Sequence, residues 1–368
     1  MVNKKGNGID MKCRATDFYI SNIRFSVSIN ENYYDSVCQY IHKSIGSELL
    51  CNNVFEKKIF YLVSNFEYNT ACKMIDNCNL YEKVEYFKNS YCYQFYFQEQ
   101  IWIKEENADW IIKIDDKKMC IYVSETNDMY NIYLLRILRS IAYGINEDKG
   151  MILLHAAAVQ YDEKGIVIIG EKGSGKTTML INFIMSNANF ISNDRVFIND
   201  KMEIISFPQA LRIGVGSFEN AKNMKRYYQN RDFYRRQANI NSTTFKYLIT
   251  IDEICTIFDS MALMKGNLDW VVVPQIQIDS EECHLECITE EKKKKEIFDK
   301  ICFTPIDESF RYEWIYSRKC TIENIIQKRK DIWNIFKNKK FITVRYGTLN
   351  EPAYVIGEIS KFMRNIEN

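Results

Sequence analysis

The chain has 368 residues, of which 46% are hydrophobic and 14% aromatic, so it exceeds one typical domain and can build buried cores. Its 49 Lys and Arg residues nearly balance 48 Asp and Glu residues, and the formal charge of +1 excludes a general attraction to nucleic acid or to acidic membrane surfaces. No apolar run approaches the roughly 18 residues that a membrane-spanning helix requires, so we expect no membrane partner. The balanced charge leads us to expect no nucleic-acid partner either.

Short, aromatic-rich segments separated by polar turns dominate the chain up to about residue 124, and they predict β-strands. These segments are Phe18–Ile20, Ile23–Ile29, Ile59–Val63, Tyr93–Phe97, Ile101–Ile103, Trp110–Ile114 and Met119–Val123. Residues from Met129 to Ile145 carry apolar side chains at nearly helical spacing, which predicts a connecting helix. We therefore expect residues 1–145 to form a smaller, strand-rich α+β domain, mostly antiparallel. Its aromatic residues are interpreted as sheet core rather than as partner contacts.

The second part of the chain, residues 146–368, starts with an apolar segment that predicts a strand over Met151–Val159. A polar turn follows, and the apolar run Ile166–Ile169 predicts the next strand. His155 therefore lies on a strand next to the one that leads into the following motif. A lone histidine in an apolar strand is often a satisfied core residue, so a functional role and a core role both stay open.

A phosphate-binding motif of the form G-x-x-x-x-G-K-[ST] follows that second strand and leads into a predicted helix. Its glycines let successive backbone N–H groups curl around phosphate oxygens, Lys176 reaches the β- and γ-phosphates, and the Thr177 hydroxyl binds Mg²⁺. The positive end of the helix dipole also points at the anion. We expect ATP to contact Gly170, Glu171, Lys172, Gly173, Ser174, Gly175, Lys176, Thr177 and Thr178. The alternative is a glycine-rich turn with an exposed lysine.

An apolar strand that begins at Asn189 ends in the polar pair Asn193 and Asp194. A right-handed crossover would place this strand beside the phosphate-loop strand, with the polar pair at the carboxyl end where ligands bind. Asp194 would then reach the metal or the attacking hydroxyl. The alternative is an ordinary turn, which Asn-Asp suits.

Residues 207–217 predict a strand and a loop in which Gly214 and Gly216 would allow close backbone approach to a ligand. Arg212 in this segment is a candidate phosphate clamp, or else a surface arginine beside a bulge. Basic and aromatic residues then alternate over residues 222–236. Such a stretch could hold an acidic peptide or a nucleic acid strand, but a solvated helix face or loop explains it more simply.

The segment Tyr247–Glu253 has two interpretations. An apolar run followed by Asp252 and Glu253 resembles the acidic site of ATPases, in which a glutamate activates water. Thr250 with Glu253 three residues later is also a capping box at the start of a helix. We favour the helix cap.

Twelve cysteines lack the paired spacing of a disulfide framework, and the N-terminus lacks a charged segment followed by an apolar one. We therefore expect reduced thiols in a cytoplasmic protein. The densest group of possible metal ligands includes Cys283, His284, Glu286 and Cys287. Strand alternation would put the cysteines on one face and the other two on the opposite face, so we interpret this group as an ordinary strand.

The remaining elements complete an α/β domain. The charge run at Glu290–Glu296 predicts the solvent face of a helix that continues through Phe298. Trp270–Pro274 predicts a buried strand that the proline ends, Phe341–Tyr346 predicts another strand, and residues from about Glu351 to Ile366 predict a closing helix.

From His155 to Val196 the chain resembles the ATP-binding core of the HPr serine kinase/phosphorylase superfamily, which is related in fold to phosphoenolpyruvate carboxykinase. The shared features are a histidine on the preceding strand, the phosphate loop, and a strand ending in an Asp-Asp-Arg-Val-like motif, here Asn193 to Val196. Leu211–Gly214 and Trp270–Pro274 are similar to features of HPr-kinase-like proteins from peptide natural-product gene clusters. With these segments the resemblance covers about residues 130–360.

The resemblance implies an α/β P-loop kinase domain over residues 146–368, in which an aspartate pair serves the acceptor hydroxyl and the metal. In the family the first aspartate is the base, but this chain has Asn193 there, and an amide accepts no proton at neutral pH. The resemblance therefore leaves Asp194 or His155 as the base, with Lys176 on the phosphates.

The sequence as a whole predicts a kinase that uses ATP and Mg²⁺, with Thr177 and Asp194 on the metal. The acceptor would be a hydroxyl, serine or threonine, on a peptide or protein, which could be a ribosomal peptide natural product. The alternatives are an ATPase or switch that uses Glu253, and a nucleotide-sensing module that acts through the N-terminal domain.

Overall fold

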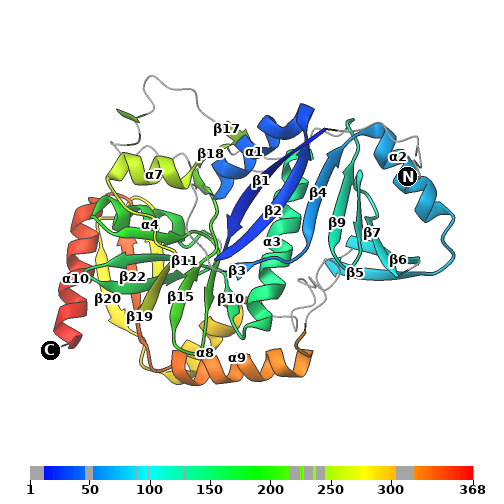
Figure 1. Cartoon of the computed structure of the whole chain (residues 1–368). Coiled ribbons are helices and arrows are strands. Elements are labelled where there is room, and N and C mark those ends of the chain that lie inside the picture. The colour runs from blue at the N-terminus through cyan, green and yellow to red at the C-terminus, as the bar shows by residue number, and fades with distance from the viewer. Residues whose placement is uncertain are drawn as a thin grey trace. The chain divides into compact units, whose positions relative to one another are not determined.

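The computed structural model describes residues 12–45, 53–87, 90–97, 99–126, 130–171, 173–214, 224, 226–227, 235–237, 245–303 and 319–367. These residues divide into two compact units (Figure 1). The first unit contains the described residues up to Gly144 except residues 43–45, and the second contains those three residues and the described residues from Ile145 onward. Within the described part of the chain, no helix is both long enough and apolar enough to cross a bilayer.

The first unit contains a mixed nine-stranded sheet in the order β1-β2-β4-β9-β8-β7-β6-β5, with β3 beside β2. Its strands are β1 (Cys13–Ile20), β2 (Ile23–Asn30), β3 (Asn53–Val54), β4 (Lys58–Val63), β5 (Tyr81–Phe87), β6 (Ser90–Phe97), β7 (Gln100–Glu105), β8 (Trp110–Ile114) and β9 (Lys118–Val123). The seven strands predicted from the aromatic segments are all present. Antiparallel pairing runs from β5 to β9, whereas β2, β4 and β9 pair in parallel.

Three helices accompany these strands. They are α1 (Glu31–Ile45), α2 (Asn65–Asp76) and α3 (Tyr130–Asp148). Ala71 and Ile75 of α2 pack against Trp102 and Ile111 of the sheet. The predicted connecting helix corresponds to α3, whereas α1 and α2 were not predicted.

The second unit is built on a ten-stranded sheet whose two parts share the long strand β19 (Lys265–Gln277). One part has the order β13-β11-β12-β19-β22-β20 and the other has the order β19-β15-β14-β10-β21. The further strands are β10 (Ile152–Leu154), β11 (Ala156–Tyr161), β12 (Lys164–Ile169), β13 (Asn189–Ser192), β14 (Val196–Ile198), β15 (Glu203–Ser206), β20 (Cys283–Cys287), β21 (Cys302–Phe303) and β22 (Lys340–Gly347). A separate small sheet contains β16 (Leu211–Gly214), β18 (Phe245–Ile249) and β17 (Arg235–Gln237).

Helices cover both faces of the sheet part that contains β12, which explains why its strands read as continuous apolar runs. Ile166 and Ile168 pack with α4 (Lys176–Met185), α7 (Ile251–Phe258) and α10 (Pro352–Glu367). Val167 and Ile169 face the other way and pack with α8 (Glu291–Ile301) and α9 (Ile322–Phe336). Figure 1 shows α4 and α10 on one side of these strands and α8 and α9 on the other.

The predicted end of a strand at Pro274 is wrong, because β19 continues to Gln277. The pairing of β12 with β19 ends at Val272, whereas the pairing with β22 continues through Pro274 to Gln277. Beyond Val272 this edge of β19 has no strand partner among the described residues, although the Ile276 N–H donates to the Ser174 carbonyl oxygen at 3.2 Å. A proline is tolerated at position 274 because no ladder hydrogen bond needs its missing N–H.

Candidate functional site

The phosphate loop, Gly170–Thr177, connects the end of β12 to the start of α4, and the structure describes all of it except Lys172. Gly175 is the N-cap of α4 with φ 96°, and a Cβ there would lie 2.9 Å from the Tyr346 hydroxyl. No side chain caps the helix. The N-cap residue is a glycine, so it offers no carboxylate or hydroxyl of its own to the first turn of α4, an arrangement that suits phosphate oxygens.

Lys176 lies across this loop. Its Nζ donates to the carbonyl oxygens of Gly170 at 2.6 Å and Glu171 at 3.1 Å. Burial lowers the pKa of Lys176, and the charge of Asp194 partly opposes that shift. The ammonium group is thus partly withdrawn from water. In this less polar environment its attraction to an anion is stronger than at an open surface.

His155 and Asp194 lie close together because each stands at an interruption between two strands, and these two interruptions are neighbours in the sheet. The predicted strand Met151–Val159 is in fact β10 and β11, which meet at His155. The strand predicted to end in Asn193 and Asp194 is β13, which ends at Ser192 directly before them, and β14 begins at Val196. β10 pairs with β14 and β11 pairs with β13, so the two breaks lie opposite each other. The expected position of β13 beside β12 is wrong, because β11 lies between them.

Their side chains form a hydrogen-bonded pair, with His155 Nε2 3.0 Å from Asp194 Oδ1. Burial alone would raise the pKa of Asp194, but the hydrogen bond and charge of His155, with the charges of Arg195 and Lys176, lower it overall. About two fifths of each side chain stays exposed, 39% for His155 and 41% for Asp194. Asp194 is therefore a partly exposed carboxylate whose pKa is lowered in part by the charge of Lys176.

The turn that carries Asp194 is fixed by its neighbours. Asp194 has a left-handed backbone with φ 68°, a conformation that Asn and Asp tolerate better than other non-glycine residues. The Ser192 Oγ lies 2.6 Å from the Arg195 carbonyl oxygen and accepts the Phe207 N–H at 3.2 Å. Asn193, directly before Asp194, is only 5% exposed. The Asp194 side chain therefore points toward His155, whereas Asn193 is buried.

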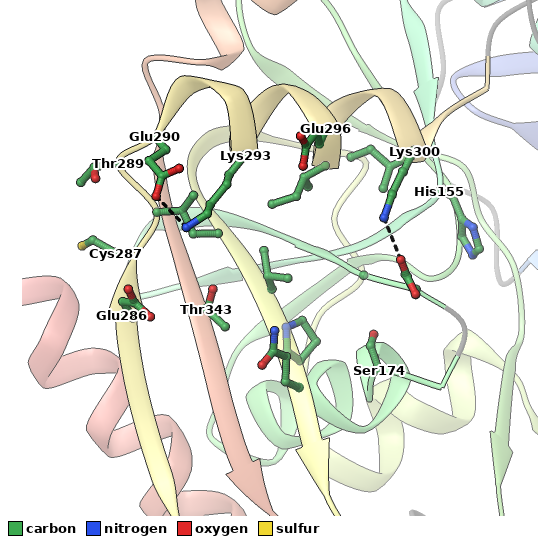
Figure 2. Close-up of a pocket in the computed structure, with 18 residues that line it drawn as sticks. His155, Ser174, Glu286, Cys287, Thr289, Glu290, Lys293, Glu296, Lys300 and Thr343 are labelled. Atoms are coloured by element: carbon green, nitrogen blue, oxygen red, sulfur yellow. Dashed lines mark hydrogen bonds and ion pairs between the residues drawn. The ribbon is translucent and has the colours of Figure 1, made fainter.

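A cavity of about 540 Å³ opens beside the first half of the phosphate loop and His155 (Figure 2). Its floor contains residues of β19, β20 and β22, and α8 forms the opposite wall. Lys300 of α8 pairs with Glu171 of the loop at 2.9 Å, and the His155 N–H donates to the Ile301 carbonyl oxygen at 2.7 Å. The end of α8 is therefore anchored between the loop and His155.

The donor atoms at the loop fit magnesium bound together with a nucleotide. Mg²⁺ prefers hard oxygen ligands and is commonly held by one or two protein groups plus substrate phosphates. The Thr177 hydroxyl and the Asp194 carboxylate are groups of this kind, and among the described residues no group of three or more His, Cys, Asp or Glu side chains could hold an ion by itself. This donor set suits a metal that arrives with a triphosphate.

The other predicted site residues lie elsewhere or outside the described chain. Arg212 is exposed on β16, in the small separate sheet, and its role as a phosphate clamp stays a prediction. The basic and aromatic stretch at 222–236 lies mostly outside the described residues. Thr250 and Glu253 form the predicted capping box at the start of α7, with both hydrogen bonds present. Cys283–Cys287 is the predicted strand, β20.

Sequence reasoning missed the contribution of α8. The run at Glu290–Glu296 indicated a charged helix, and the helix is present, but its side chains were assigned only to solvent. Lys293 and Lys300 in fact point into the cavity (Figure 2). The seven-residue spacing of these lysines, two helical turns, was the available signal for a shared face.

No family model matches the chain, and no curated protein matches it. The likeness to the HPr serine kinase/phosphorylase superfamily therefore stays a prediction from the residues quoted above.

Proposed function

We propose that the protein is an ATP- and Mg²⁺-dependent kinase with an HPr-kinase-like P-loop domain, and that it transfers the γ-phosphoryl group to a serine or threonine hydroxyl of a peptide or protein. One observation carries the proposal. Lys176, at the uncapped start of α4, and Asp194, paired with His155, are close enough for each charge to shift the pKa of the other. A triphosphate on the loop would thus end beside a carboxylate and an imidazole. We also propose a cytoplasmic location, where ATP is supplied.

Each residue has a defined role in this proposal. The loop amides and Lys176 hold the phosphates, and Thr177 and Asp194 hold the metal that neutralises them. His155 receives the proton of the acceptor hydroxyl, and its hydrogen bond to Asp194 fixes the ring. The acceptor oxygen then bonds to the γ-phosphorus while the bond to ADP breaks. Because phosphoryl transfer depends mainly on positioning and charge stabilisation, an amide at Asn193 does not preclude it.

The capping box disfavours the ATPase alternative. In that alternative Glu253 activates water, but its Oε2 accepts the Thr250 N–H at 2.8 Å. A carboxylate that accepts the N-cap N–H in a capping box stabilises the helix and is not positioned by that contact to activate water. Because a glutamine amide oxygen can accept the same N–H, we expect Glu253→Gln to lower the free energy of unfolding by less than about 1 kcal/mol and to leave ATP turnover unchanged. Accumulation of trapped ATP in this variant would favour the ATPase instead.

The decisive experiment incubates the protein with Mg²⁺, γ-labelled ATP and a library of serine and threonine peptides. The kinase proposal predicts label in peptide, and Lys176→Ala should abolish it. Label found only in free phosphate would contradict the proposal. Binding of a partner protein that Lys176→Ala retains, with no turnover in either form, would favour a nucleotide-sensing module.

A further inference from the structure

The cavity beside His155 has a charge opposite to that of the phosphate loop. Its lining carries four carboxylates, from Glu171, Glu286, Glu290 and Glu296, and two ammonium groups, from Lys293 and Lys300. Four negative and two positive charges leave a net charge of −2 in the lining, without His155. A cavity of this sign disfavours phosphate and favours a cation.

Both lysines are already engaged with carboxylates. Lys293 pairs with Glu290 at 2.6 Å, and Lys300 pairs with Glu171 at 2.9 Å. Among the described residues, Glu286 and Glu296 have no ion-pair partner within 4 Å. Both are exposed at the cavity, Glu286 on β20 and Glu296 on α8. These two carboxylates are therefore the groups available to an incoming cation.

The cavity lies beside both the proposed proton acceptor and the first part of the phosphate loop. Its lining includes His155, Gly170, Glu171 and Ser174, but not Lys176 or Thr177, which serve the phosphates and the metal. Ser174 Oγ is buried, has no hydrogen-bond partner among the described residues, and points toward the cavity (Figure 2). An unsatisfied buried hydroxyl is costly unless a ligand supplies its partner. The cavity thus begins at His155 and the first residues of the loop and extends along β19, β20, β22 and α8.

We propose that this cavity binds the acceptor, and that the acceptor is a serine- or threonine-bearing peptide segment with a Lys or Arg side chain a few residues from the hydroxyl. The hydroxyl lies at the His155 end, and the cation lies between Glu286 and Glu296. Figure 2 shows His155 and Glu286 at opposite ends of the cavity, and about 540 Å³ falls within the size range of ligand pockets. This inference rests on the proposed kinase function and adds the class of substrate.

The test separates peptide binding from catalysis. Synthetic peptides with one central serine carry arginine at each position from −4 to +4, and matched peptides carry the uncharged isostere citrulline. Calorimetry in the presence of Mg²⁺ and a non-hydrolysable ATP analogue measures binding, and γ-labelled ATP measures transfer. The proteins are the wild type, the double variant Glu286→Gln/Glu296→Gln, and Glu281→Gln. Glu281 is an exposed glutamate outside the cavity and serves as the matched control.

We expect the best arginine peptide to bind wild type and the control variant about tenfold more tightly than its citrulline counterpart, because exposed charge pairs contribute up to about fivefold each. The double variant should lose this preference and keep its affinity for MgATP. Labelling without any charge preference would overturn the inference and leave the kinase intact. Weaker MgATP binding by the double variant, with no effect of peptide charge, would also overturn it and assign the cavity to the nucleoside. Charge-dependent binding without labelling would support the inference and contradict the kinase.

Discussion

At the residue scale, the account depends on a small number of side chains that the chain brings together from three separate segments. His155 lies between β10 and β11, Asp194 between β13 and β14, and Lys176 at the start of α4. The motif in the sequence identified Lys176 directly. The sequence explained His155 more readily as a core residue, and Asp194 could also belong to an ordinary turn, whereas in the structure their side chains lie 3.0 Å apart.

Replacement of Lys176 tests the phosphate site. A nucleotide that binds only the folded state raises the unfolding temperature, and the increase grows with affinity. We expect saturating MgATP to stabilise the wild type in thermal unfolding and to have almost no effect on Lys176→Ala. Lys201→Ala removes an exposed lysine from a turn and is the matched control. An equal ATP effect in wild type and Lys176→Ala would contradict the assignment.

The pH dependence of stability tests the environment of Asp194. Its pKa in the folded state is lowered by His155, Arg195 and Lys176 against the opposing effect of burial. A carboxyl with a lowered pKa stabilises the fold fully above its unfolded pKa of about 4. That contribution disappears as the pH falls through the folded-state value. Urea unfolding should therefore show wild type and Asp194→Asn differing at pH 7 and converging toward pH 3. A difference in the free energy of unfolding that stays constant across this pH range would show that the neighbouring charges do not lower the pKa of Asp194.

At the element scale, turns and caps decide the geometry of the loop. Gly173 and Gly175 both have positive φ, 87° and 96°, but a Cβ on Gly173 meets no atom within 4 Å, whereas one on Gly175 meets the Tyr346 hydroxyl and Ile276. Alanine in a left-handed conformation costs roughly 1–2 kcal/mol. We expect Gly173→Ala to show about this loss in urea unfolding and Gly175→Ala to show more. Equal losses would mean that the contact with Tyr346 is not close.

The cap of α7 gives a second prediction at this scale. Thr250 Oγ1 accepts the Glu253 N–H at 3.1 Å. Thr250→Ala should lower the free energy of unfolding by about 1 kcal/mol without changing MgATP affinity. Thr256→Ala, on the solvent side of the same helix, removes only a contact to the Asp252 carbonyl and should have a smaller effect. A change in MgATP affinity in the Thr250 variant would connect α7 to the nucleotide.

Regular elements were easier to predict than interruptions. Seven of the nine strands of the first unit follow from apolar spacing and turn residues, as do β12, β20, β22, α3, α8 and α10, whereas β3 and β5 were not predicted. The end of β13 at Asn193 and Asp194 also follows from these polar residues, but the break at His155 does not, because apolar residues flank it and only the pairing partners decide where β10 ends and β11 begins. The same reason explains Pro274, which is acceptable inside β19 only because β12 stops two residues earlier. Residues that shape the site are thus where local patterns are least informative.

At the scale of the whole molecule, the second unit contains every residue that the proposal uses, and the first unit contributes none of them. Each unit has its own large sheet. The composition predicted more than one domain, and the motif predicted a phosphate site. The acidic cavity could not be predicted, because its carboxylates come from the loop, β20 and α8, which are far apart in the sequence and meet only in the fold.

The central claim is that a triphosphate on the loop is bound together with a metal that Asp194 holds. Calorimetric titration of ATP into wild type and Asp194→Asn, each with and without magnesium, measures this most directly. We expect magnesium to tighten ATP binding to the wild type by at least about tenfold, equivalent to about 1.4 kcal/mol. Asp194→Asn should bind metal-free ATP as tightly as the wild type does, but magnesium should not tighten its ATP binding. No ATP binding by the wild type, or the same magnesium effect in both proteins, would contradict the claim.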